Sequence, residues 1–361
     1  MEHLGHPRPR PPLENRQVAP PVAAVSQPPS RLPTPWRDRP GRKPSEPPSR
    51  LPIQNSDSKK NSPQFATIRV NARFPFPPSK KEILQFLQFL SNSPRVNSQP
   101  LGIFDSGVGG LTVVKAVRDL LPHESIVYLG DTARLPYGSK SPETIRQFAE
   151  EDVRFLISRG VKAIVVACNT ASAHALSALQ ANHDLPIIGV IEPGVDAALA
   201  DPACQRVGII ATRGTIRSHA YQHALALRRP DLLILEQPAP LLAPLIEENW
   251  LDHPATIAAL QTYLQPLLDR GMDTLLLACT HYPLLVPTLR KLLGPDIRLV
   301  DSATTCAQHL QQHLASLDLL APAGNTPSFD LFLTDLSEQF ELLAARFLNS
   351  PPLQATRVEL S

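Results

Sequence analysis

The sequence predicts an α/β fold built on parallel sheets, and two observations support this. From residue 101 onward, short apolar runs rich in Val, Ile and Leu end in turn residues. Helical patterns with an apolar spacing near 3.6 separate the runs, most clearly at 141–159 and 255–270. Runs without polar alternation are typical of strands buried on both faces of a parallel sheet, and strands that alternate with helices form βαβ units.

Eight such runs are expected to be strands, and their ends repeat. They lie at 102–107, 125–131, 163–170, 186–194, 206–212, 232–237, 274–281 and 297–302. Asp105 and Cys168 each end a run, and Thr212 and Cys279 each end another run at a similar separation. Two similar α/β units, each with a polar group and a cysteine at strand ends, would explain this spacing.

A different composition precedes the predicted strands. Residues 1–100 hold 21 of the 40 prolines and carry 16 Lys and Arg against 6 Asp and Glu, a net charge of about +10. Proline fixes φ and removes a hydrogen-bond donor, so we expect residues 1–96 to be a disordered Pro/Arg-rich extension with a short helix only at 81–91. Several interpretations of this extension are open: a solvated arm, a transit segment, a start-site artefact, or a basic arm that binds nucleic acid or membrane.

Cysteine use and hydropathy exclude several protein classes. Cys168, Cys204, Cys279 and Cys306 lie far apart, without a C-x-x-C pair or the spacing of a zinc site. No apolar run reaches the roughly 18 residues that a membrane span needs, and no apolar signal segment follows the first charges. We therefore expect a cytoplasmic protein without a metal or a disulfide framework.

Reactive side chains gather at the predicted strand ends. In open α/β sheets, ligands bind beyond the carboxyl ends of the strands. The segments placed there are Asp105–Ser106–Gly107, Cys168–Asn169–Thr170, Thr212 and Cys279–Thr280–His281. A cysteine between a strand and a helix start faces the positive end of the helix dipole, so we expect a lowered thiol pKa at Cys168 and Cys279. Cys204 and Cys306 lack polar neighbours and are expected to be inert buried thiols.

The glycine-rich loop at 105–110 allows an alternative. It resembles a dinucleotide-binding loop, and Asp131 follows at another strand end, but the third glycine of G-x-G-x-x-G would fall on Thr112. Backbone amides at a helix start could instead hold a carboxylate. A nucleotide-dependent oxidoreductase remains a remote alternative, because it leaves both cysteine motifs unexplained.

Two thiols in one site favour racemisation at an amino-acid Cα. This reaction needs a base on one face of Cα and a proton donor on the other, and a thiolate and a thiol can exchange these roles. The α-proton is weakly acidic, so the site must stabilise a carbanion by desolvation and preorganised donors.

The chain resembles the bacterial glutamate racemases of the aspartate/glutamate racemase superfamily. The segments that carry the resemblance are GIFDSGVGGLTV, YLGDTARLPYGSKS, VVACNTASAHAL, GVIEPGV, GIIATRGTIRS, PLIEENWL, LLLACTHYPLL and the closing FDLFLTDLSEQF. The resemblance implies two similar parallel-sheet α/β domains related by a pseudo-twofold axis, with the active site between them. It places the first domain at 100–192 plus 300–345, the second at 193–299 and a C-terminal tail at 346–361.

The resemblance also implies residue roles. Cys168 would remove the α-proton of D-glutamate and Cys279 that of L-glutamate. Asp105 would assist Cys168, His281 would assist Cys279, and Asp131 and Glu247 would give further acid/base support. The residues implied to bind the substrate are Asp105, Ser106, Pro136, Tyr137, Gly138, Asn169, Thr170, Thr212, Thr215, Thr280 and His281.

The activity implied is cofactor-independent interconversion of L- and D-glutamate, which supplies D-glutamate for peptidoglycan, cell-wall biogenesis and cell shape. Glutamate is then the small-molecule partner, neither nucleic acid nor membrane is required, and a homodimer is an open option. An aspartate racemase is the nearest alternative, although members of that group usually carry an acidic residue where this chain has His281. A second alternative is a regulatory protein without catalytic activity that acts through the basic tail.

Overall fold

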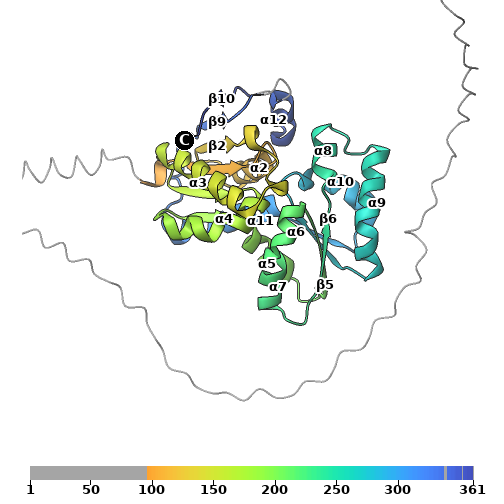
Figure 1. Cartoon of the computed structure of the whole chain (residues 1–361). Helices are drawn as coiled ribbons and strands as arrows, with labels where there is room; N and C mark the ends of the chain where they lie inside the picture. Colours follow the sequence, from red (N-terminus) through yellow and green to blue (C-terminus); the bar gives the residue numbers. More distant parts are fainter. Residues whose placement is uncertain (1–95, 337–339, 352, 361) are drawn as a thin grey trace, which may run out of the picture. The chain divides into compact units, whose positions relative to one another are not determined.

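The structure, a computed structural model, describes residues 96–336, 340–351 and 353–360. The extension predicted for 1–96 and its helix at 81–91 therefore lie almost wholly outside the described residues. Two parallel β-sheets with helices packed around them make up the described part of the chain (Figure 1).

The first sheet has six strands in the order β10-β9-β2-β1-β3-β4, and every neighbouring pair is parallel. Its strands are β1 (Leu101–Asp105), β2 (Ile126–Gly130), β3 (Ala163–Val166), β4 (Ile187–Gly189), β9 (Phe329–Leu333) and β10 (Thr356–Arg357). Every residue of β1, β2, β3 and β4 is buried, as expected for strands covered on both faces.

The second sheet has four parallel strands in the order β6-β5-β7-β8. These are β5 (Arg206–Ala211), β6 (Leu233–Pro238), β7 (Thr274–Ala278) and β8 (Arg298–Asp301). The eight predicted strands are thus confirmed. Strands β9 and β10 were not predicted, because β9 contains Asp330 and is only partly buried and both residues of β10 are exposed.

The two sheets repeat one topology. The first sheet contains the order β2-β1-β3-β4, and the second sheet has the order β6-β5-β7-β8. In both, the first strand of the unit along the chain lies between the second and the third, and the fourth lies beside the third. The first strand of one unit ends at Asp105, and Thr212 directly follows the first strand of the other. The third strands are likewise followed by Cys168 in one unit and Cys279 in the other. The predicted pair of similar α/β units is confirmed, while the exact division of the chain into domains stays a prediction.

Both predicted helices begin at capping residues. Ser141 accepts a hydrogen bond from Thr144 N and Pro142 opens α3, whereas His253 and Pro254 open α9 in the same way, which confirms both predicted helices. The helices are α2 (Leu111–Leu120), α3 (Pro142–Ser158), α4 (Asn169–Asn182), α5 (Ile191–Leu199), α6 (Arg213–Ser218), α7 (Ala220–Arg228), α8 (Leu242–Glu247), α9 (Pro254–Asp269), α10 (Val286–Leu293), α11 (Ser302–Ser316) and α12 (Phe340–Leu348). Short 3-10 turns are η1 (Val96–Ser98), η2 (Thr132–Arg134), η3 (Tyr137–Ser139) and η4 (Tyr282–Leu285).

Helix α11 joins the two sheets. It starts directly after β8 of the second sheet, where Asp301 caps it, and packs against α2, which follows β1 of the first sheet. One continuous hydrophobic cluster includes Leu101 and Ile103 of β1 together with Leu275 and Leu277 of β7. Helix α12 also packs on α2. None of the helices in the described ranges is long and apolar enough to cross a bilayer.

Candidate active site

Cys168 and Cys279 line one cavity of about 280 Å³. Each thiol follows the third strand of its sheet, and loops at the strand ends complete the walls. The other residues that line the cavity are Ser106, Gly107, Leu135, Pro136, Tyr137, Gly138, Asn169, Thr170, Thr212, Ala243, Pro244, Glu247, Thr280 and His281. The structure therefore brings together most of the predicted site residues and leaves Asp105, Asp131 and Thr215 behind the walls.

Cys168 caps the N-terminus of α4. Its Sγ accepts a hydrogen bond from Ala171 N at 3.5 Å and lies 3.7 Å from Ser106 Oγ. Burial, with the nearby charge of Asp105, raises the pKa of the Cys168 thiol to about 12 despite these contacts. The expectation of a lowered thiol pKa is thus wrong for Cys168, because desolvation outweighs the donors at the helix start.

Asp105 supports this half of the site from behind the cavity wall. Its Oδ2 accepts hydrogen bonds from Gly107 N at 3.2 Å and Gly110 N at 3.0 Å, so the amides of the glycine loop are directed at this carboxylate. Its Oδ1 is buried and has no hydrogen-bond partner among the described residues. Burial raises the pKa of Asp105, although the charge of His281 and the loop amides oppose that effect.

On the Cys279 side of the cavity, close polar contacts connect Cys279 to His281 and His281 to Glu247. Cys279 Sγ lies 3.9 Å from His281 Nδ1, and His281 Nε2 lies 2.8 Å from Glu247 Oε1 at the end of α8. Burial alone would lower the pKa of His281, but its hydrogen bonds and charge interactions with Cys279 and Glu247 raise it to about 10. His281 therefore carries its proton at neutral pH, beside the Cys279 sulfur.

The glycine loop of the first sheet packs directly against these residues. A Cβ on Gly109 would lie 2.3 Å from Thr280 Oγ1 and 2.4 Å from His281 Nδ1, so only glycine fits there. Thr112 Oγ1, at the start of α2, donates toward Thr280 O at 2.8 Å and Gly109 O at 2.9 Å. These contacts tie the strand ends of the two sheets together at the site.

Hydroxyl groups form the wall between the two units. The side-chain oxygens of Thr170, Thr212 and Thr215 lie 3.0–3.1 Å from one another, and Thr212 caps α6. Thr215 thus forms hydrogen bonds with the other two threonines but does not itself line the cavity. Asn169 lines the cavity, but its amide accepts from Tyr221 Oη at 2.7 Å and donates to Ser302 Oγ at 3.3 Å.

Asp131 lies in a buried network behind Tyr137. Tyr137 Oη lies 2.5 Å from Asp131 Oδ2 and 3.0 Å from Asp152 Oδ2. Arg134 Nε donates to Asp131 Oδ2 at 2.7 Å, and the same guanidinium pairs with Asp152 and Glu151. Burial and the charge of Asp131 raise the pKa of Asp152. The network supports the Leu135–Gly138 wall and not the cavity interior.

Sequence reasoning missed part of this supporting structure. Asp152 falls on the buried face of α3 with Ile145, Ala149, Val153 and Leu156, and an acidic residue in that apolar spacing was an available signal. The apolar wall residues Leu135, Ala243 and Pro244 carry no comparable signal.

The remaining cysteines lie elsewhere. Cys204 and Cys306 are buried and do not line the cavity, as predicted for inert thiols, and burial raises the pKa of both, that of Cys306 to about 12. Over residues 96–336, 340–351 and 353–360, no group of three or more His, Cys, Asp or Glu side chains is arranged to hold a metal ion.

Comparisons with known proteins agree with this geometry. The Asp/Glu/Hydantoin racemase family matches residues 111–310. A glutamate racemase from Syntrophus aciditrophicus is 44% identical over 269 residues, which cover 74% of this chain and 99% of the relative.

Solved structures give the same picture. Glutamate racemase RacE1 from Bacillus anthracis superimposes with a TM-score of 0.70 at 39% identity, over 73% of this chain and 98% of that one. Glutamate racemase from Francisella tularensis, solved in complex with D-glutamate, superimposes with a TM-score of 0.68 at 36% identity, over the same shares. The chain therefore belongs to the glutamate racemases of the Asp/Glu/Hydantoin racemase family.

Proposed function

We propose that this chain interconverts L- and D-glutamate by a two-base mechanism in which Cys168 and Cys279 act on opposite faces of Cα, without a cofactor. The observation that carries the proposal is the placement of both thiols on one cavity, each at the end of the third strand of a repeated unit. The glutamate racemase with D-glutamate bound supports the choice of substrate.

The steps balance without another reactant. With L-glutamate, the Cys279 thiolate removes the α-proton, and the electron pair left on Cα spreads into the α-carboxylate. The Cys168 thiol then donates its proton to the opposite face, which gives D-glutamate, a Cys279 thiol and a Cys168 thiolate. With D-glutamate the same steps run in reverse. After a turnover from L- to D-glutamate, loss of a proton from the Cys279 thiol and gain of a proton by the Cys168 thiolate restore the starting state.

The electrostatics of the two halves of the site differ. Burial and Asp105 hold the pKa of Cys168 at about 12, so this thiol keeps its proton. On the other half, His281, whose pKa is raised to about 10, lies 3.9 Å from the Cys279 sulfur. The proposed reaction of L-glutamate requires a Cys168 thiol and a Cys279 thiolate. We assign Asp105 and His281 as assistants of Cys168 and Cys279, with Glu247 supporting His281 and Asp131 supporting the Tyr137 wall.

The walls supply the groups that bind substrate. Ser106, Thr170, Thr212 and Thr280 line the cavity, together with Asn169, Pro136, Tyr137 and Gly138. We assign the two carboxylates of glutamate to these donors, because preorganised hydroxyl and amide groups stabilise the charge that spreads onto the α-carboxylate. Asp105 and Thr215 act on the substrate indirectly, through the groups that they hold.

We place this activity in the cytoplasm, where it supplies D-glutamate for peptidoglycan. Glutamate is the small-molecule partner, and neither nucleic acid nor membrane takes part. A homodimer is our working assembly, and sedimentation analysis of the purified chain tests it.

The experiment that tests the mechanism is solvent deuterium incorporation at Cα, measured with L- and D-glutamate separately and without added cofactor. We expect the natural chain to incorporate deuterium from both enantiomers, and Cys168→Ala and Cys279→Ala each to lower racemisation by at least about 10²-fold. Cys204→Ala and Cys306→Ala are the matched controls and retain turnover, because neither thiol reaches the cavity.

The same measurement tests the assignment of faces. Cys168→Ala keeps Cys279 and should exchange the α-proton of L-glutamate only, whereas Cys279→Ala should exchange that of D-glutamate only. The opposite preference would reverse the assignment, and retained racemisation in either variant would refute the two-base mechanism.

A further inference from the structure

The His281 imidazole is enclosed from several sides. Cys279 Sγ lies at Nδ1 and Glu247 Oε1 at Nε2, at 3.9 and 2.8 Å. Gly109 lies so close to Nδ1 that a methyl group there would overlap it. The orientation of the ring therefore decides whether both nitrogens keep their partners at once.

Phe347 of α12 provides the aromatic contact on this ring. The centroids of the two rings lie 5.3 Å apart with an interplanar angle of 87°, an edge-to-face arrangement that aromatic pairs prefer. Phe347 is 1% exposed, and α12 is held against α2. Phe347 is therefore held in place by the packing of α12.

Helix α12 also reaches the partner of His281. Arg346, next to Phe347, donates from Nη1 to the backbone carbonyl of Glu247 at 3.2 Å. Consecutive residues of one helix thus contact both members of the His281–Glu247 pair.

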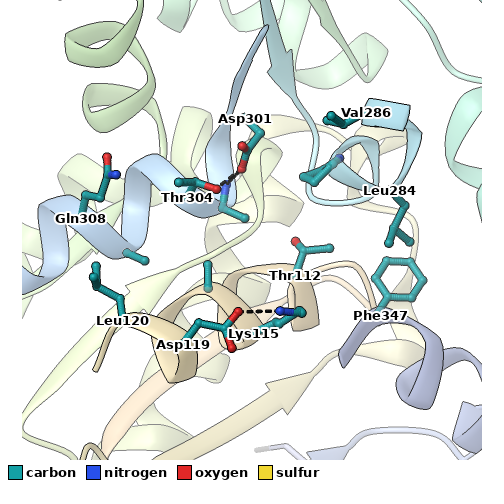
Figure 2. A pocket seen from close by; sticks show the side chains of 14 residues that line it. Thr112, Lys115, Asp119, Leu120, Leu284, Val286, Asp301, Thr304, Gln308 and Phe347 are labelled. Atoms are coloured by element: carbon teal, nitrogen blue, oxygen red, sulfur yellow. Dashed lines mark hydrogen bonds and ion pairs between the residues drawn. The ribbon is translucent and has the colours of Figure 1, made fainter. Parts of the chain in front are cut away.

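The surroundings of Phe347 leave its ring room to move if the contact is lost. Phe347, Thr112 and Leu284 line a second cavity, of about 550 Å³, between α2, α10, α11 and α12 (Figure 2). The Phe347 ring thus lines this second cavity and also contacts the His281 ring.

We propose that Phe347 is a positioning residue for the Cys279 half of the reaction. By holding the His281 ring edge-to-face, it keeps Nδ1 directed at the Cys279 sulfur and Nε2 at Glu247, and so maintains the proton path that serves Cys279. The Cys168 sulfur instead has hydrogen bonds with Ser106 and Ala171. The inference rests on the proposed two-base function.

The test compares Phe347→Leu with Phe340→Leu. Phe340 lies on the same helix, is 2% exposed and belongs to the same hydrophobic cluster, so it is a matched control for lost packing. The readout is the primary isotope effect with α-deuterated L-glutamate, where Cys279 removes the label, against that with α-deuterated D-glutamate, where Cys168 removes it.

We expect Phe347→Leu to lower the turnover rate by about 2- to 10-fold, the rate equivalent of one lost aromatic contact. Because the step at Cys279 becomes slower relative to the step at Cys168, the isotope effect should rise with labelled L-glutamate and fall with labelled D-glutamate. Phe340→Leu should leave the ratio of the two effects at its value in the natural chain. Phe347→Tyr keeps the aromatic ring, so it should keep that ratio.

An unchanged ratio in Phe347→Leu would overturn the proposal, whatever happens to rate or stability. If Phe347→Leu fails to fold, Phe347→Met keeps the volume without the ring and is judged by the same ratio. A natural chain that exchanges no α-proton would sink the proposed function instead, so the two failures are distinguishable.

Discussion

His281 joins a buried thiol on one side to a partly exposed carboxylate on the other. Its imidazolium is stabilised because both neighbours carry negative charge when ionised, and together they outweigh the cost of burial. The same interactions make the proton of His281 part of the stability of the fold. Between the ordinary pKa of about 6.5 and the folded-state value of about 10, only the folded chain binds this proton, so its contribution to stability falls as pH rises through that window.

Replacing Glu247 by Gln should move the alkaline limb of the activity profile. The neutral amide no longer stabilises the imidazolium, so the pKa of His281 falls from about 10 toward its ordinary value and activity is lost at lower pH. The measurement is kcat/KM against pH. Glu248→Gln, on the exposed neighbouring residue, is the control and should leave the limb in place. An identical limb in both variants would show that Glu247 does not set the protonation of His281.

At the scale of elements, one buried network fixes the position of the η2–η3 segment. Arg134 and Tyr137 from this segment meet Asp152 of α3, and Thr334, just after β9, donates to Asp131 Oδ1 at 2.9 Å. Arg134 also lies 4.1 Å from the centre of the Phe148 ring of α3. Two helical turns, a long helix and a strand end are thus joined through fully buried carboxylates.

Arg134→Ala should test this network. It leaves the buried carboxylates of Asp131 and Asp152 without their cation, so we expect the free energy of unfolding to fall by about 2 kcal/mol or more. KM should rise as well, because the Leu135–Gly138 wall of the cavity loses its support. Urea unfolding and steady-state kinetics measure the two effects.

Arg146→Ala on α3 is the control for that experiment. Arg146 pairs with Glu143 on the surface, where both side chains are largely exposed, so its loss should cost at most about 0.5 kcal/mol. Equal losses in the two variants would mean that the Arg134 network contributes no more than a surface ion pair.

At the scale of the whole molecule, the part of the chain shared with its relatives is sufficient to build the site. The Syntrophus aciditrophicus relative is matched over 99% of its length by 74% of this chain, and every residue that lines the cavity falls between Ser106 and His281. The ordered start of the described chain is held by Lys162, which is buried, pairs with Glu124 and donates to Asn97 O at 2.6 Å.

Deleting residues 1–95 should therefore leave kcat and KM unchanged. The truncated chain keeps Asn97 and its bond to Lys162. Kinetics of the purified truncated chain, with circular dichroism as a check on folding, measure the outcome. Lost turnover with the fold preserved would make the extension part of the enzyme.

The sequence predicted the strands and the thiols because their signals are local. Apolar runs identify buried parallel strands wherever they occur, and both cysteines stand directly after such runs. Strand β9 was missed because Phe329–Leu333 contains Asp330 and is only partly buried, and β10 was missed because its two residues are exposed at the edge of the sheet. Phe347 was missed because its importance comes from a contact with His281, which is distant in the chain, whereas the signal for Asp152, an acidic residue in the apolar spacing of α3, was overlooked. The raised pKa of Cys168 was missed because it depends on how deeply the thiol is buried, and the degree of burial cannot be calculated from the sequence alone.

Thermodynamics limits how far the two halves of the site can differ in their effect. The two enantiomers of an amino acid have equal free energy in water, so the ratio of kcat/KM for the two directions must equal one for every variant. The two halves of the site are built on the same strand topology but assisted differently, Asp105 behind one thiol and His281 beside the other. A substitution in either half must therefore slow both directions equally in kcat/KM. Any inequality between the halves is confined to how tightly each enantiomer binds and to which proton transfer limits the rate.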